Sequence, residues 1–371
     1  MIGQIATEKY SAWANEALEQ SLKNIARWAR LPILWERALR VRKGATPSEV
    51  VWEQGHVRLL HYPGNQVRYR TPLVFVFALV NRPYILDLKP GKSVVEHFVR
   101  QGFDTYLIDW GAPTDADRHL TLDDYINGYL LDVAQFVKQR CGAQKLNILG
   151  YCMGGTMSAM FTALHQELVK NLILLAAGID FSSKDGLLLR WTDAKYFDVD
   201  QLVDVCGNAP AQFLQAAFQL LKPVANLIEK PMNLWERLDD DAFVDDFLTM
   251  ETWLQDNIAV PGEVFREFVK HLYQNNRLTK GQMPVGRKIV DLTRITCPIL
   301  NIMASKDDLV PCGQSQPFND LVSSKDRKTM MLEAGHIGLA VGGRAQKEIW
   351  PAAAQWLAER SDAVASPRSA R

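Results

Sequence analysis

The sequence has no paired-cysteine motif, no excess of charge of either sign and no long hydrophobic run. Its five cysteines stand at irregular spacing, which argues against a structural zinc site or a disulfide framework. Lysine plus arginine equal aspartate plus glutamate at 42 each, so no net positive field attracts nucleic acid or an anionic membrane. The longest apolar run, Leu73–Val80, is far shorter than the roughly 20 residues that span a bilayer.

The first residues also lack the continuous apolar segment of a secretory signal, because Met1–Trp13 mixes polar and apolar side chains. Together with the unpaired cysteines, this predicts a cytoplasmic protein with free thiols. The cysteine and histidine spacings give no reason to expect a metal ion or another cofactor. Residues 1–45 have apolar positions near helical spacing, which Pro32 interrupts, and they predict an N-terminal helical segment.

Strand-like and helix-like patterns alternate from about residue 56 onward. A leading hairpin is predicted around Pro63-Gly64, and Leu73–Val80 has the composition of a strand buried on both faces. Further short apolar runs, separated by helical patterns, stand at 105–109, 146–149, 172–176, 298–303 and 329–332. This alternation predicts an α/β protein with a mostly parallel sheet and helices on both faces.

One connection between predicted strands, about 120 residues long, exceeds any ordinary loop. It is rich in aromatic residues at helical spacing, and the sheet resumes after it, so an inserted helical cap is preferred to a separate second domain. The predicted order is therefore an N-terminal segment, two core parts around a cap, and a disordered tail: residues 1–45, 46–178, 179–292, 293–359 and 360–371.

The segment Gly150-Tyr151-Cys152-Met153-Gly154-Gly155 follows a predicted strand and precedes a predicted helix. The α/β-hydrolase nucleophile elbow is Gly-x-Ser-x-Gly in this same strand–turn–helix setting. Glycines are needed because the nucleophile occupies a strained turn where a neighbouring Cβ would collide with strand or helix. The helix N-terminus favours a thiolate, so Cys152 is the candidate nucleophile, whereas the other cysteines lack this setting and are interpreted as core residues.

A thiol nucleophile needs a base, and the base needs an acid that orients it. In this fold the acid follows a later strand and the histidine follows the last one. Of the seven histidines, His336 alone follows the last predicted strand, where Gly335 and Gly338 flank it. Asp307 and Asp308 both follow the strand at 298–303; Asp307 is preferred, and the other is interpreted as a solvated loop charge or a helix cap.

The oxyanion formed during acyl transfer needs backbone N–H donors. The topology of the elbow predicts one donor at Met153 and a second after the third strand, at Val80 or Asn81. A cysteine nucleophile suits the exchange of one thioester for another, because attack on an acyl-CoA keeps the acyl group activated on the enzyme. The residues thus predict an acyltransferase that must exclude water, for which a large aromatic cap is suitable.

These residues resemble the short catalytic subunits of polyhydroxyalkanoate synthases over roughly residues 45–358. The resemblance rests on several segments taken together: Phe77–Tyr84, Tyr106–Gly111, Leu120–Tyr129, Gly150–Gly155, Tyr273–Asn276, Ile295–Pro298 and Gly335–Gly338. The length and the Val80–Pro83 stretch are most similar to class III, whose catalytic subunit works with a second, non-catalytic subunit. Class IV, with a different small partner, is the next most similar.

The resemblance implies polymerisation of (R)-3-hydroxyacyl-CoA, typically 3-hydroxybutyryl-CoA, into polyester with release of CoA, at the surface of cytoplasmic granules. It implies that Cys152 carries the growing chain, that His336 deprotonates it, and that Asp307 orients His336 or helps to activate the substrate hydroxyl. Many relatives have a histidine after that aspartate, whereas this chain has Asp308, whose charge can repel that of Asp307. A homodimer is also expected.

Two other functions fit parts of the same pattern. A thioesterase or hydrolase with the same three residues would release free 3-hydroxy acid and no polymer. A non-enzymatic granule-binding or scaffold protein would give Cys152 no cause to react faster than Cys141.

Overall fold

The computed structural model describes residues 2–183 and 185–364, with side chains from residue 15 onward. It divides into two compact units. The larger unit is formed by residues 43–221 and 256 onward, and the smaller by residues up to 42 with 222–255. No helix among the described residues has the length and apolar character needed to cross a bilayer.

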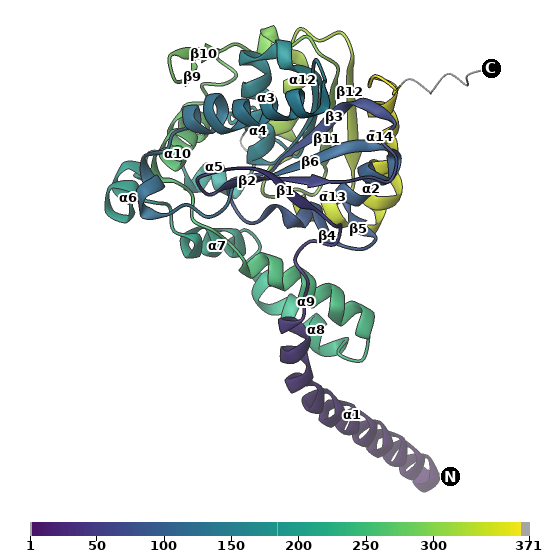
Figure 1. Cartoon of the computed structure of the whole chain (residues 1–371). Helices are drawn as coiled ribbons and strands as arrows, with labels where there is room; N and C mark the ends of the chain where they lie inside the picture. Colours follow the sequence, from purple (N-terminus) through teal and green to yellow (C-terminus); the bar gives the residue numbers. More distant parts are fainter. Residues whose placement is uncertain (1, 184, 365–371) are drawn as a thin grey trace, which may run out of the picture. The chain divides into compact units, whose positions relative to one another are not determined.

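The larger unit is built on one eight-stranded sheet (Figure 1). Its strands, in spatial order, are β1 (Glu49–Gln54), β2 (Val57–Tyr62), β6 (Phe103–Asp109), β3 (Tyr69–Val76), β7 (Leu146–Tyr151), β8 (Val169–Leu175), β11 (Ile299–Ala304) and β12 (Arg327–Leu332). All neighbours from β6 to β12 pair in parallel, while β1–β2 and β2–β6 are antiparallel. The predicted α/β class with a mostly parallel sheet is confirmed.

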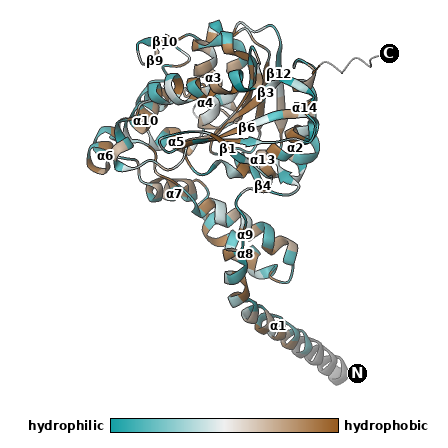
Figure 2. Cartoon of the chain, viewed as in Figure 1, coloured by the Kyte–Doolittle hydropathy of each residue, from teal (hydrophilic) through white to brown (hydrophobic). Residues whose placement is uncertain are grey.

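Helices cover the sheet because its inner strands are apolar on both faces. Every residue of β7 and β11 is buried, and Figure 2 shows hydrophobic colour along the inner strands. The covering helices are α2 (Val94–Gln101), α3 (Leu130–Cys141), α4 (Met153–Leu164) and α14 (Trp350–Ala358). Phe98 of α2 meets Trp350 of α14 edge-on, with ring centroids 6.3 Å apart.

The remaining regular elements are short. Two small sheets pair β4 (Asp87–Lys89) with β5 (Lys92–Ser93) and β9 (Met283–Val285) with β10 (Lys288–Val290). Short helices α11 (Cys312–Ser315), α12 (Phe318–Leu321) and α13 (His336–Val341) follow β11 and β12.

The predicted hairpin around Pro63-Gly64 is wrong. The hairpin instead joins β1 to β2 through Gly55, whose φ of +59° suits a tight turn. Pro63-Gly64 lies in the connection from β2 to β3, and these two strands do not pair with each other because β6 lies between them.

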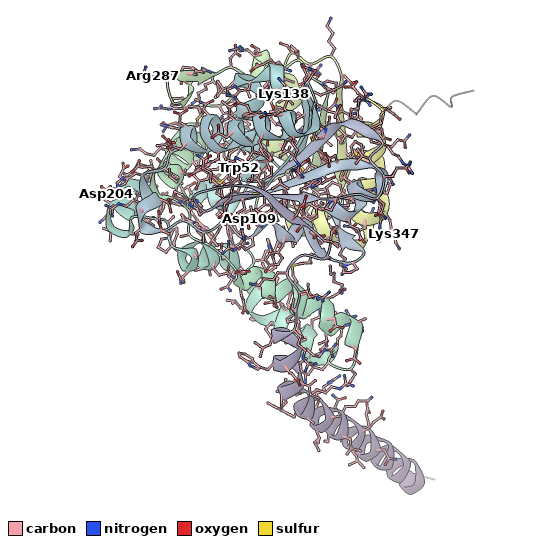
Figure 3. The ribbon with its side chains drawn as sticks, viewed as in Figure 1. Trp52, Asp109, Lys138, Asp204, Arg287 and Lys347 are labelled. Atoms are coloured by element: carbon pink, nitrogen blue, oxygen red, sulfur yellow. The ribbon has the colours of Figure 1, made fainter. Side chains whose placement is uncertain are left out.

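The chain between β8 and β11 is largely helical. In the larger unit it forms α5 (Leu187–Trp191), α6 (Val199–Cys206), α7 (Ala211–Leu220), α10 (Gly262–Glu267) and η6 (Phe268–Gln274). Val199, Val203 and Val269 form a small buried cluster here. Asp204, labelled in Figure 3, projects outward from α6 and pairs with Arg266 across 2.6 Å. The cap boundaries 179 and 292 stay predictions.

The smaller unit joins the N-terminal helix to the middle of the predicted cap. It contains α1 (Ile2–Leu39), η5 (Ala225–Glu229), α8 (Lys230–Glu236) and α9 (Asp241–Gln255). Contrary to the predicted interruption, α1 continues through Pro32 to Leu39.

The disorder predicted from residue 360 does not hold for residues 360–364. The backbone N–H of Arg70 donates to the Asp362 oxygen at 2.6 Å, and the N–H of Val364 donates to the Arg68 oxygen at 2.8 Å. Buried Asn147 also donates to the Ser361 hydroxyl at 2.9 Å. These hydrogen bonds fix the segment against the start of β3, while the predicted disorder at 365–371 lies outside the described residues.

Candidate active site

Cys152 occupies the sharp turn between β7 and α4. Its φ of +57° and ψ of −127° lie outside the regions that L-residues ordinarily adopt, so the turn is strained. The Cys152 N–H donates to the backbone oxygen of Leu175 at 2.9 Å, which anchors the turn to β8. Cys152 is only partly buried, and it follows directly on the carboxyl end of β7, where ligands bind in sheets of this kind.

The two glycines of the motif are required by close packing. A Cβ at Gly154 would lie 2.2 Å from the backbone oxygen of Val76, and one at Gly150 would lie 2.6 Å from the Cα of Gly155. Both contacts are with backbone, which cannot move aside without displacing β3 or α4. The helix therefore starts close against the sheet, as the motif predicts.

His336 begins α13, immediately after the loop that follows β12. Its Nδ1 lies 2.7 Å from Asp307 Oδ2, and its ring lies near enough to Cys152 for the charge of the sulfur to act on it. Tyr151 holds the histidine from a third side: the two rings stack with centroids 5.0 Å apart, and the Tyr151 hydroxyl donates to the His336 backbone oxygen at 3.1 Å. The imidazole thus lies between the sulfur and the carboxylate in a fixed orientation.

Asp307 lies just past the end of β11 with a fully buried side chain. Its Oδ1 accepts the backbone N–H groups of Leu309 and Val310 at 2.9 and 2.8 Å, while Oδ2 faces His336. Asp308 is exposed. Of the two acids that the sequence offers, the structure brings Asp307 to the histidine, and both of its oxygens are engaged in holding the loop and the ring.

The electrostatics of the site favour a protonated histidine. Burial by itself lowers the pKa of His336, but the facing Cys152 sulfur and the Asp307 carboxylate outweigh it and raise that pKa to about 10. At neutral pH both ring nitrogens then carry protons, and the proton on Nδ1 is directed at Asp307. An imidazolium beside the sulfur stabilises negative charge on it, which is the form that attacks a thioester.

The structure shows less about the predicted oxyanion donors than about Cys152, His336 and Asp307. Met153 is the first residue of α4, where backbone N–H groups have no acceptor inside the helix. The N–H of Asn81 donates to Asn257 Oδ1 at 3.2 Å, so it is engaged within the protein. Of the two alternatives after β3, this leaves Val80 as the better second donor. Val80 and Met153 stay predictions.

Two tyrosines at the site were not predicted. Tyr273 of η6 has a raised pKa because it is buried and because the negative charges of Cys152 and Asp307 lie near it. Its ring packs on Phe181, with centroids 4.7 Å apart. Asn276, at φ +46°, fixes this end of η6 by accepting the Phe181 N–H at 2.9 Å and donating to Asp180 at 2.8 Å. The sequence signal for Tyr273 was the family resemblance at Tyr273–Asn276. Tyr151 had no sequence signal other than its position next to Cys152.

The other four cysteines lack a histidine partner like His336. Burial raises the pKa of Cys297 to about 11 and, with the charge of Asp104, that of Cys141 to about 12. Cys312 donates to the backbone oxygen of Ala304 at 3.2 Å, and Cys206 is exposed on α6. Among the described residues, no group of three or more histidine, cysteine or acidic side chains is arranged to hold a metal ion.

Comparison with protein families matches two regions of the chain. Residues 72–342 match the α/β hydrolase fold, and residues 37–98 match the N-terminus of poly-β-hydroxybutyrate polymerase, PhaC. Among similar proteins is the poly(3-hydroxyalkanoate) polymerase subunit PhaC of Haloferax mediterranei, 44% identical over 93% of this chain and 70% of the relative. The PhaC subunit of Allochromatium vinosum is 42% identical over 85% of this chain and 90% of its own length.

This chain belongs to the PhaC family. Similarity to solved structures supports the fold alone. The putative non-heme bromoperoxidase BpoC of Mycobacterium tuberculosis H37Rv superposes with a TM-score of 0.53 at 14% identity, over 84% of this chain and 99% of that one. The family resemblance inferred from the sequence is therefore confirmed, and with it the assignment as an acyltransferase of the α/β-hydrolase fold.

Proposed function

We propose that the chain polymerises (R)-3-hydroxyacyl-CoA, typically 3-hydroxybutyryl-CoA, through a covalent thioester on Cys152. Membership of the PhaC family supports the reaction. The observation that carries the mechanism is the grouping of three side chains, in which His336 bonds Asp307 and lies beside the Cys152 sulfur. No cofactor is needed, because the substrate brings its own activated acyl group.

In the first step the Cys152 thiolate attacks the thioester carbonyl of the acyl-CoA. Negative charge develops on the carbonyl oxygen, where the N–H groups of Met153 and Val80 stabilise it. The C–S bond to CoA then breaks, the CoA sulfur takes the proton of the His336 imidazolium, and the acyl group remains on Cys152. One thioester is broken and one is made, so the step is near thermoneutral.

In the second step neutral His336 accepts the proton of the 3-hydroxyl of an incoming acyl-CoA. That oxygen attacks the Cys152 thioester, an oxygen ester forms, and the sulfur leaves as thiolate beside the regenerated imidazolium. The chain, longer by one unit and carried on CoA, then returns to Cys152 by the first step with release of CoA. Asp307 orients His336 throughout, because both carboxylate oxygens are already engaged.

Water must be excluded from the site, because it would hydrolyse the thioester that carries the growing chain. Phe181, Phe268 and Tyr273 pack together, with centroids of Phe181 and Phe268 6.2 Å apart, and Tyr273 approaches the site closely enough to sense the charges of Cys152 and Asp307. An apolar cover of this kind favours transfer to a hydroxyl group delivered by the substrate over hydrolysis.

The assembly of the enzyme is part of the same proposal. The relatives are named as polymerase subunits, which supports a second, non-catalytic subunit of the class III type. We propose in addition a homodimer of the catalytic chain and a location in the cytoplasm at the surface of the polymer granule.

The test is product analysis with 3-hydroxybutyryl-CoA, with and without a class III-type second subunit. Release of CoA with accumulation of polyester is expected, and Cys152→Ala should abolish both, while Cys206→Ala serves as the matched control. Polymer that still forms with Cys152→Ala would contradict the mechanism. Free 3-hydroxybutyrate without polymer would instead identify a thioesterase.

A further inference from the structure

The loop that follows β3 has a strained residue directly after Val80, the better second oxyanion donor. Asn81 has a φ of +66°, in the left-handed region that residues other than glycine seldom adopt, and it is buried. A conformation of this kind persists only where surrounding contacts hold it. The backbone N–H of Asn81 makes such a contact, because it donates to Asn257 Oδ1 at 3.2 Å.

The side-chain amide of Asn257 is itself held at both ends. This residue lies in the segment that joins α9 to α10. Its Oδ1 also accepts the backbone N–H of Ile258 at 2.8 Å. Its Nδ2 donates to two oxygens of α7, the backbone oxygen of Ala211 at 3.3 Å and Oε1 of Gln215 at 3.4 Å. An amide accepts at one end and donates at the other, so these contacts allow one orientation, and Asn257 presents a fixed acceptor to the loop after β3.

The residue before Asn257 holds the same loop three residues further on. The carboxylate of Asp256 accepts the Tyr84 hydroxyl at 3.1 Å and pairs with Lys43 at 2.6 Å. Asp256 and Asn257 are neighbours in the chain, and between them they contact the loop at Asn81 and at Tyr84. The position of the loop is therefore tied to the position of this segment.

The contact of Asn257 with Asn81 also restricts Val80, the half-buried residue before it. The peptide unit that joins Val80 to Asn81 is planar, so an acceptor that fixes the direction of its N–H limits the rotation of Val80 as well. A hydrogen bond weakens steeply as its angle departs from linearity. A Val80 N–H that is aimed before the substrate binds can stabilise the oxyanion without reorganisation.

We propose that Asn257 is a positioning residue for the oxyanion donor at Val80. By accepting the Asn81 N–H, it holds the strained turn in the shape that directs the Val80 N–H at the reacting carbonyl. The inference rests on the proposed function, which assigns the stabilisation of the oxyanion to Met153 and Val80. Asn257 acts through Asn81 and does not touch the substrate, so its loss should slow acylation of Cys152 without weakening the binding of acyl-CoA.

The experiment measures CoA release in a single turnover of 3-hydroxybutyryl-CoA, with the full chain in excess and the class III-type second subunit present. Asn257→Ala should lower the saturating rate about tenfold, equivalent to about 1.4 kcal/mol, and leave the half-saturating concentration within about twofold. Gln215→Ala is the matched control, because it removes a partner of Asn257 Nδ2 but leaves the Oδ1 acceptor in place. Its saturating rate should stay within about twofold of that of the unmutated chain.

A second substrate distinguishes positioning of the donor from general damage to the fold. In the dithioester analogue of 3-hydroxybutyryl-CoA, sulfur replaces the carbonyl oxygen, and sulfur accepts hydrogen bonds only weakly. The rate with this analogue depends less on the oxyanion donors, so Asn257→Ala should lower it by less than about threefold. A loss caused by general disorder of the site would affect both substrates equally.

Thermal unfolding compares the stability of the two variants, each of which lacks one hydrogen-bonding side chain. A saturating rate for Asn257→Ala equal to that of the unmutated chain overturns the proposal. A loss of the same size with both substrates also overturns it, because the loss would then not depend on the oxyanion. CoA release with free 3-hydroxybutyrate and no polymer would count against the proposed function alone, since a thioesterase forms the same oxyanion and the ratio of rates still tests Asn257.

Discussion

Cysteine, histidine and aspartate meet twice in the larger unit, in opposite order. At the elbow, His336 lies between the Cys152 sulfur and Asp307. At the other place Asp104 lies in the middle: Cys141 donates to its Oδ2 at 3.1 Å, and His61 faces its Oδ1 at 2.7 Å. The same three residue types thus build two sites in which the sulfur has a different neighbour.

The central residue decides what the sulfur can do. Burial raises the pKa of Cys141 to about 12, and the Asp104 carboxylate, which accepts a hydrogen bond from the thiol and opposes its ionisation, adds to the rise. Asp104 itself stays ionised, since hydrogen bonds from His61 and Cys141 outweigh its burial and lower its pKa. At the elbow the group beside the sulfur is instead the His336 ring, which can exchange a proton with it. We therefore interpret the Cys141 cluster as structural and the Cys152 cluster as reactive.

The largest expected effect on the rate of CoA release distinguishes His336 from His61. His336→Gln removes the group that carries the proton in both steps, so CoA release from 3-hydroxybutyryl-CoA should fall about 10³-fold or more. His61→Gln should leave the rate within about threefold, because the hydrogen bonds and ring stacking of His61 are with Asp104, Glu49 and Tyr106 and not with the residues of the Cys152 site. A large loss with His61→Gln would mean that the second cluster takes part in catalysis.

The next largest effect on the rate of CoA release distinguishes Asp307 from Asp308, the two acids that follow β11. Asp307→Asn keeps the size of the side chain but removes the charge that orients and supports the imidazolium, and CoA release should fall about 10²-fold. Asp308→Asn removes an equal charge at an exposed position one residue away and should change the rate by less than about threefold. Similar losses for both variants would show that Asp307 has no special role.

A smaller effect concerns the reactivity of the second sulfur. Asp104→Asn removes the carboxylate beside Cys141, so the pKa of that thiol should fall and its alkylation by iodoacetamide at pH 8 should accelerate about tenfold, corresponding to one pKa unit. Mass spectrometry of labelled peptides follows Cys141 and Cys152 in one sample. Asp109→Asn is the control, because Asp109 lies on the same strand but pairs with Arg58 at 2.6 Å. Unchanged labelling of Cys141 would leave burial alone as the cause of its high pKa.

The Cys152 site could be predicted from sequence because most of its determinants are local. The glycines of the elbow, the strand before it and the helix after it lie within one short segment, and their steric requirement allows few alternatives. His336 and Asp307 followed from strand order. The Cys141 cluster could not be predicted in this way, since it depends on the register that pairs His61 with Tyr106 and on the end of α3 reaching Asp104.

The smaller unit shows a second limit of the sequence pattern. Apolar spacing in residues 1–45 correctly predicts a helix, but it does not reveal that arginines hold α1 in place and that the apolar face remains exposed. Nor does the pattern show that Lys222–Gln255 groups with α1 rather than with the rest of the predicted cap. Both facts depend on contacts between segments about 200 residues apart, for example that of Arg37 with Asp241.

The smallest expected effect is the pH dependence that His61 gives to stability. Hydrogen bonds with Asp104 and Glu49 outweigh its partial burial and raise its pKa in the folded chain, so folding favours the protonated ring. The resulting stabilisation is fully present below the unfolded-state pKa of about 6.5 and is lost as pH rises through the higher folded-state pKa. Thermal unfolding of the unmutated chain and of His61→Gln should therefore differ more at pH 6 than at pH 9. His336 titrates in both proteins, so its own contribution cancels in the difference. A gap that is the same at both pH values would mean that His61 is neutral in the folded state and that its contacts act by packing alone.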